Sequence, residues 1–173
     1  MGEGNHENLA TGRMRPVSPW CKLGRHAQAR RGNAMGITGD ASVNRPPSNI
    51  RLATERDAGP VADIYAPNVT DTVISFEAEP PDAGEMRRRI AGTLERYPWL
   101  VCERRGRVLG YAYAGAHGTR EAYRWSVDVS VYVHGEAHRE GVGRALYTSL
   151  FAALELQGFY NAYAGATLPT RRA

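Results

Sequence analysis

The pattern of apolar positions predicts alternating strands and helices from residue 49 onward. The apolar, β-branched run from Val127 to Val133 is dense enough to indicate a largely buried strand. After a polar loop, apolar residues recur at helical spacing, which predicts an amphipathic helix over about 144–157. The residues on its apolar side are Ala145, Leu146, Leu150, Ala153 and Leu154.

Shorter patterns predict the remaining elements. Apolar runs indicate strands at 49–53, 97–103, 108–114 and 159–166, the middle two joined as a hairpin through Arg105-Gly106-Arg107. Thr54 and Asp57 form a capping-box pattern before a helix that turns Val61, Ile64 and Tyr65 inward, and Asp82 caps a second helix over 85–96. Arg87 to Arg89 on that helix are expected to be a solvated face, and Gly158 is expected to end the long helix. The order β α α β β β α β predicts an α/β fold, a mixed sheet with helices on its faces.

The loop between the buried strand and the long helix carries Gly141-Val142-Gly143. A strand, a glycine-containing loop and a helix N-terminus together form a phosphate-binding arrangement, because backbone N–H groups and the helix dipole both face the ligand. The dinucleotide fingerprint GxGxxG is excluded, since position 146 is Leu146. A tight structural turn is the alternative.

The excess of basic over acidic residues in the chain is confined to its first 48 residues. They hold seven Lys/Arg and three acids, and the rest of the chain holds fifteen of each. The composition predicts a disordered basic extension over 1–48 and a domain over 49–173. No apolar h-region follows Arg30-Arg31, so a twin-arginine signal is rejected, and a nucleic-acid-binding arm is a minor alternative. Met35 could be the natural start.

Cysteines and hydropathy narrow the class of protein further. Cys21 and Cys102 are far apart and form no metal or redox motif, and no apolar run is long enough to span a membrane. We expect a cytoplasmic enzyme with free thiols, no metal, no membrane partner and no nucleic-acid partner.

The segment from His138 to Gly143, after Val131-Tyr132-Val133 and before Ala-Leu-Tyr, resembles the acyl-CoA pyrophosphate loop of the GNAT acetyltransferases. That family's loop reads Gln or Arg, two residues, Gly, one residue, Gly or Ala; His138 stands at the first position. The resemblance implies acetyl-CoA as co-substrate. The residues it implies as contacts are Val131, Tyr132, Val133, His138, Arg139, Glu140, Gly141, Val142, Gly143 and Arg144.

Segments from about residue 50 to 169 are similar to one branch of that family, the phosphinothricin N-acetyltransferases. The resemblance implies transfer of acetyl from acetyl-CoA to the amino group of a small amino acid or analogue, by direct attack, with a possible homodimer. The segments are Ser75-Phe76-Glu77 with Glu79-Pro80, 96–101, Tyr111 to Gly115, Ala122-Tyr123, Trp125 with Val127, Leu146-Tyr147 and 157–159.

Four residues of this resemblance are candidates for chemistry. Asp128 stands where the family has a glutamate base. Burying a carboxylate is costly, so an acid on a strand expected to be buried indicates a functional role. A structural acid bonded to nearby amides is the alternative. Arg120 and Tyr123 match substrate-contacting positions, although Gly118 replaces the lysine of the branch. Phe76 is expected either to line the acceptor pocket or to pack in the core.

The end of the chain departs from the family pattern. The family continues past Leu-Pro-Asn with a helix and two strands, whereas Leu168-Pro169 is followed here by Thr170 and three more residues. This predicts a GNAT fold lacking its last helix and strands. An inactive remnant, which at most binds coenzyme A or associates with other subunits, is therefore the competing hypothesis.

Overall fold

A computed structural model of the chain describes residues 48–166. The predicted extension lies outside these residues except for Ser48, and so does the segment from Leu168 to the end. Among the helices that the structure describes, none combines the length and apolar character needed to cross a membrane.

The described elements follow the predicted order and form one five-stranded mixed sheet. The strands lie in the order β1-β2-β3-β4-β5, with antiparallel pairing from β1 to β4 and parallel pairing between β4 and β5. The elements are β1 (Asn49–Leu52), α1 (Ala58–Thr70), α2 (Ala83–Leu94), β2 (Trp99–Arg104), β3 (Arg107–Ala116), β4 (Ser126–Val133), α3 (Val142–Leu156) and β5 (Asn161–Tyr163). Three short 3-10 turns join them: η2 (Glu55–Asp57), η3 (Glu121–Tyr123) and η4 (Gly135–Ala137).

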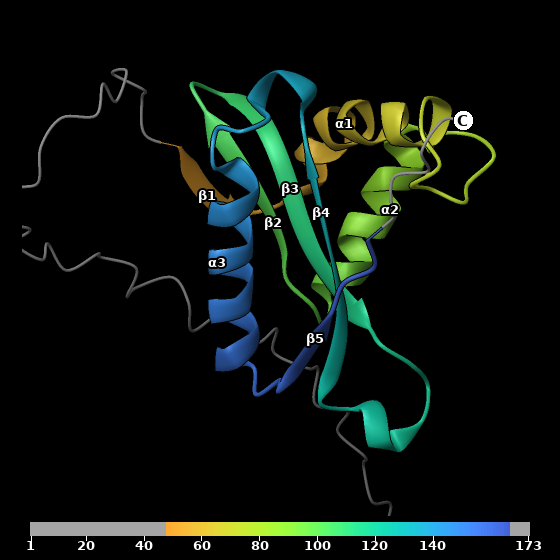
Figure 1. Cartoon of the computed structure of the whole chain (residues 1–173), viewed down its shortest axis with the longest axis vertical. Helices are drawn as coiled ribbons and strands as arrows, with labels where there is room; N and C mark the ends of the chain where they lie inside the picture. The colour runs from red at the N-terminus through yellow and green to blue at the C-terminus, as the bar shows by residue number, and fades with distance from the viewer. Residues whose placement is uncertain (1–47, 167–173) are drawn as a thin grey trace, which may run out of the picture. The chain divides into compact units, whose positions relative to one another are not determined.

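Helices cover both faces of the sheet (Figure 1). Helices α1 and α2 pack on one face through a core that includes Val61, Ile90 and Tyr111, and α3 packs on the other through Leu146 and Leu150. Because side chains alternate along a strand, the odd-numbered residues of β4 face α3, and the even-numbered ones face the side of α1 and α2. This alternation decides which side chains of β4 can meet.

A half-buried network of ion pairs holds the segment that leads into the N-terminus of α1. Asp57 accepts the Thr54 backbone N–H at 2.7 Å, so the predicted capping box is confirmed. Arg51 donates to both oxygens of Asp57 at 2.8 Å and also to Glu103 at 2.8 Å. The hydrogen bond from Arg51 is the main cause of a lowered pKa of Asp57. The network therefore ties β1 and β2 to the first helix.

Several boundaries differ from the sequence prediction by one to three residues, and two of them bear on the site. Helix α3 begins at Val142, inside the glycine segment, so that loop and helix are continuous. Strand β5 has only three residues and begins at Asn161 rather than at 159, because the Phe159 N–H donates to the Leu154 carbonyl at the end of α3. Gly158 has φ +83° and ends α3 as predicted.

Candidate active site

The glycine loop presents the N-terminus of α3. Gly141 is the residue before the helix and has φ +80°, a left-handed conformation that favours glycine. The first N–H groups of a helix have no acceptor within it, so those of Val142, Gly143 and Arg144 are directed at whatever lies before the helix. A Cβ on Gly143 would meet only Val133 at 3.7 Å and Val131 at 4.0 Å. The arrangement can bind an anion through the backbone.

Two side chains of the loop are turned toward the protein. Glu140 accepts from Arg104 of β2 at 2.7 Å, and both side chains are less than a quarter exposed. His138 is exposed, and its Nε2 lies 3.1 Å from the Val133 carbonyl oxygen, to which it donates. Arg139 and Arg144 are exposed beside them. A contact of Glu140 with a ligand would therefore involve its backbone, whereas His138 and the two arginines remain exposed at the loop, and the arginines leave positive charge there.

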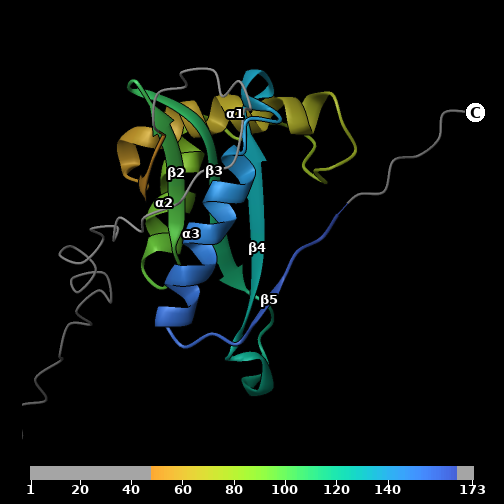
Figure 2. The same cartoon turned by 60° about the vertical axis from the view of Figure 1, so that its left-hand side comes forward.

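Strand β4 has one open edge that runs toward the loop. Strand β5 pairs with it only from Ser126 to Asp128, and the two strands then diverge (Figure 2). Beyond Asp128 the backbone groups along this edge have no strand partner among residues 48–166. Val131 and Val133 turn their side chains toward α3, and Tyr132 turns to the other face. An extended ligand could pair with this edge as a strand would.

Asp128 lies at the point where β4 and β5 part. The expectation that this acid is buried is wrong, because its side chain is 55% exposed. It faces the side of α1 and α2, opposite Gly115 in β3 and Tyr163 in β5. Its Oδ1 lies 2.7 Å from Nδ1 of His117, a residue that sequence reasoning did not select. The strand register carries His117 to this place, two residues beyond Gly115 on the same face.

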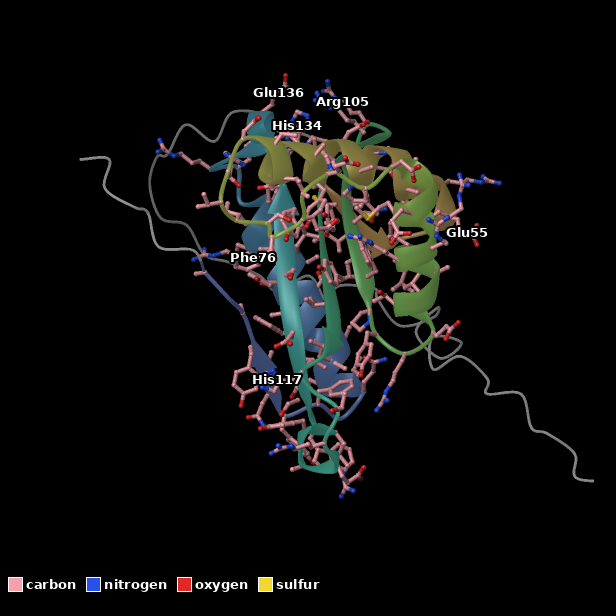
Figure 3. All side chains as sticks on the ribbon, turned by 90° about the vertical axis from the view of Figure 1, so that its right-hand side faces the viewer. Glu55, Phe76, Arg105, His117, His134 and Glu136 are labelled. Carbon is pink, nitrogen blue, oxygen red and sulfur yellow. The ribbon has the colours of Figure 1, made fainter. Side chains whose placement is uncertain are left out.

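The three predicted acceptor contacts are not gathered together. Tyr123 lies edge-on to the His117 ring at 5.2 Å, so it shares the site of Asp128. Arg120 is exposed at the start of η3. Phe76 lies in the loop after α1, fully exposed and well apart from His117 (Figure 3). Packing of Phe76 in the core is thus wrong, while its contact with an acceptor stays a prediction.

A pocket of ≈ 340 Å³ opens on the α1/α2 face, and aromatic rings form its floor. Trp99 stacks on Tyr113 with ring centres 4.4 Å apart, and Tyr111 stacks on Trp99 at 5.6 Å. Burial raises the pKa of Tyr111, so its phenol stays neutral. The indole N–H of Trp99 is buried without a partner among the described residues. The pocket therefore offers flat aromatic walls to a ligand.

An ion cluster closes one side of this pocket. Arg89 donates to Glu77 at 2.9 and 3.1 Å and to Glu85 at 2.9 Å, and the Tyr65 hydroxyl donates to Glu77 at 3.0 Å. Hydrogen bonding from Arg89 lowers the pKa of Glu77. The prediction of a solvated arginine face is therefore wrong for Arg89, although Arg88 is exposed. No cluster of side chains suited to a metal ion occurs among residues 48–166.

Comparison with known proteins agrees with this arrangement. Residues 50–167 match the family model described as an acetyltransferase (GNAT) domain. Over 128 residues the chain is 40% identical to a phosphinothricin N-acetyltransferase of Streptomyces viridochromogenes, covering 74% of this chain and 70% of that one. A second phosphinothricin N-acetyltransferase, from Alcaligenes faecalis, is 43% identical over 61% of this chain and 54% of its own length.

A solved structure gives the same fold. The phosphinothricin acetyltransferase of Sinorhizobium meliloti, crystallised with acetyl-CoA, superposes with a TM-score of 0.64 and 35% identity. The match covers 68% of this chain and 64% of that one. The family model, the relatives and the fold agree, and the chain belongs to the GNAT acetyltransferase family.

Proposed function

We propose that the chain transfers acetyl from acetyl-CoA to the amino group of a small amino acid or analogue of the phosphinothricin type. One observation carries the proposal: the open edge of β4 joins Asp128 at one end to the N-terminus of α3 at the other. A long ligand with an anionic end can lie along this edge with its anion at the helix and its reactive end at the acid.

Each part of the site has a task in this reaction. The N–H groups at the start of α3 hold the pyrophosphate, with Arg139 and Arg144 adding charge. The backbone of Val131 to Val133 pairs with the pantetheine arm. The acceptor approaches from the α1/α2 face, which is the face toward which Asp128 points. Asp128 takes a proton from the ammonium, and the neutral amine nitrogen then attacks the thioester carbon.

The acceptor class is supported by the names of the relatives and by polar groups on the α1/α2 face. Arg120 is an exposed cation with no ion-pair partner among residues 48–166 and can pair with an acidic group of the acceptor, and Tyr123 lies beside the Asp128 site. Phe76 can reach the acceptor only if its loop closes over the site. A homodimer in the cytoplasm is part of the same proposal.

Two measurements on the full chain test the proposal. Acetyl-CoA should raise the midpoint of thermal unfolding, and at a hundred times its Kd it adds about 2.7 kcal/mol of stability. Phosphinothricin should then cause release of the coenzyme A thiol, while N-acetylphosphinothricin, whose amine is blocked, should not. Absence of both effects would contradict the proposal. Stabilisation without thiol release, over a panel of amino acids, would instead support the hypothesis of a coenzyme A-binding remnant.

A further inference from the structure

His117 is held in one orientation beside Asp128. Its ring stacks on Tyr163 of β5 with ring centres 4.1 Å apart and an interplanar angle of 14°. Tyr123 of η3 meets the same ring edge-on, at 5.2 Å and 89°. Between these two rings the imidazole directs Nδ1 at Oδ1 of Asp128, 2.7 Å away. Three separate elements thus converge to fix one hydrogen bond.

A carboxylate alone is a poor acceptor for an ammonium proton near neutral pH. Aspartate side chains ordinarily titrate near 3.9 and α-amino groups near 7.7–8.0, so the proton would move about four pK units in the unfavourable direction. An imidazole ordinarily titrates near 6.5 and narrows that gap to between one and two units. General bases work best when their pKa lies near the operating pH. A carboxylate joined to an imidazole meets this condition better than the carboxylate by itself.

We propose that the base of this chain is the His117–Asp128 pair: Nδ1–H of the neutral imidazole donates to Asp128, and the ammonium proton is taken up by Asp128 and reaches the unprotonated Nε2 of His117 through solvent, to which both side chains are open. The inference deepens the proposed function and rests on it. The ammonium first gives one proton to the pair, whose net charge rises from −1 to zero, and the pair then releases this proton to solvent. The neutral amine nitrogen bonds to the thioester carbon, the C–S bond breaks, and the second proton of the nitrogen goes to the departing sulfur, so that coenzyme A leaves as the thiol. His117 acts through Asp128 and is a positioning residue.

The surroundings of the pair contain few other titratable groups. Against the His117 ring lie Asp128 from β4, Tyr123 from η3 and Tyr163 from β5. On η3, Glu121 pairs with Arg124, and Arg120 is exposed. A pH dependence that changes when the imidazole is removed can therefore be assigned to the pair.

The test compares kcat/KM against pH for the wild type and His117→Gln, with acetyl-CoA and phosphinothricin. The titration of the substrate amine affects kcat/KM of both enzymes equally. The ratio of kcat/KM in the wild type to kcat/KM in the variant therefore reports the contribution of the imidazole alone. We expect the ratio to rise with pH as the imidazole loses its proton and to reach a plateau of tenfold to a hundredfold, with KM for acetyl-CoA unchanged. His134→Gln, which removes another half-buried histidine, should give a ratio that is flat in pH. A flat ratio for His117→Gln, or full activity, would overturn the proposal.

A second measurement does not require turnover. In 15N NMR of the full chain, neutral His117 should carry its proton on Nδ1, because that nitrogen faces a carboxylate that can only accept. A neutral ring protonated on Nε2 would refute the pair even in an active enzyme. The Nδ1–H form in a chain that acetylates no amine would place the failure in the proposed function instead.

Discussion

The two ends of β4 are built differently. At its C-terminal end the loop into α3 is held by the Arg104–Glu140 ion pair and by a glycine whose backbone conformation few other residues adopt. At the other end Asp128 is exposed, and it is positioned by His117. The first end binds through the backbone and depends on local chain geometry. The second depends on side chains that strand register brings together from distant parts of the sequence.

The largest expected effect is at the acid end. Asp128→Asn keeps the shape of the side chain and removes its capacity to accept a proton, so kcat should fall by about a hundredfold to ten-thousandfold. The acetyl-CoA-induced rise in the unfolding midpoint should be retained, because the loop is untouched. Steady-state kinetics and thermal unfolding of the same preparation check both parts. A loss of acetyl-CoA binding in this variant would show that the two ends do not work separately.

The next largest effect is expected at the loop end of β4, where a substitution should change KM for acetyl-CoA more than kcat. Glu140→Gln leaves Arg104 half-buried without its anionic partner and should cost about 1–3 kcal/mol of stability. The loop loses its anchor to β2, so KM for acetyl-CoA should rise while kcat falls little. Glu136→Gln, which breaks the exposed pair with Arg107 nearby, serves as the control and should leave stability almost unchanged. Equal losses of stability in the two variants would contradict the role of Glu140 in anchoring the loop.

Gly141 allows a matched test of backbone conformation. A Cβ would find open space at both Gly141 and Gly59, but only Gly141 has a positive φ. Gly141→Ala should therefore destabilise the fold by about 1–2 kcal/mol, and Gly59→Ala in α1 should stabilise it by up to about 1 kcal/mol. Denaturant unfolding measures both. Loss of acetyl-CoA affinity is expected only for Gly141→Ala, and an equal response of the two variants would contradict the argument.

The comparison also explains what the sequence could predict. The N-cap at Asp82 and the end of α3 at Gly158 are local features, and the structure confirms them. The glycine segment does open a helix, while its binding of coenzyme A stays a prediction. The contact between His117 and Asp128 depends on the β3–β4 register and on the placement of β5, neither of which composition or periodicity encodes. The solvated face predicted for Arg89 is wrong for the same reason, because Glu77, twelve positions earlier and before α2, accepts its hydrogen bonds.

The smallest effect concerns the Glu77–Arg89 contact beside the aromatic pocket. The pKa of Glu77 is lowered in the folded chain, so its stabilising contribution is complete above the ordinary value of 4.5 and is lost as pH falls through the lower folded value. Both side chains are about one-third exposed, and the pair should therefore contribute under about 1 kcal/mol. Glu77→Gln should lower stability slightly at pH 7 and flatten its decline below pH 4.5. Glu79→Gln, an exposed acid of the same loop, is the control for denaturant unfolding at both pH values. If Glu77→Gln lost as much stability below pH 4.5 as the wild type does, the contact with Glu77 would not be what holds Arg89. Arg89 would then be held by Glu85 and by packing, and the prediction of a solvated face on this helix would be nearly right.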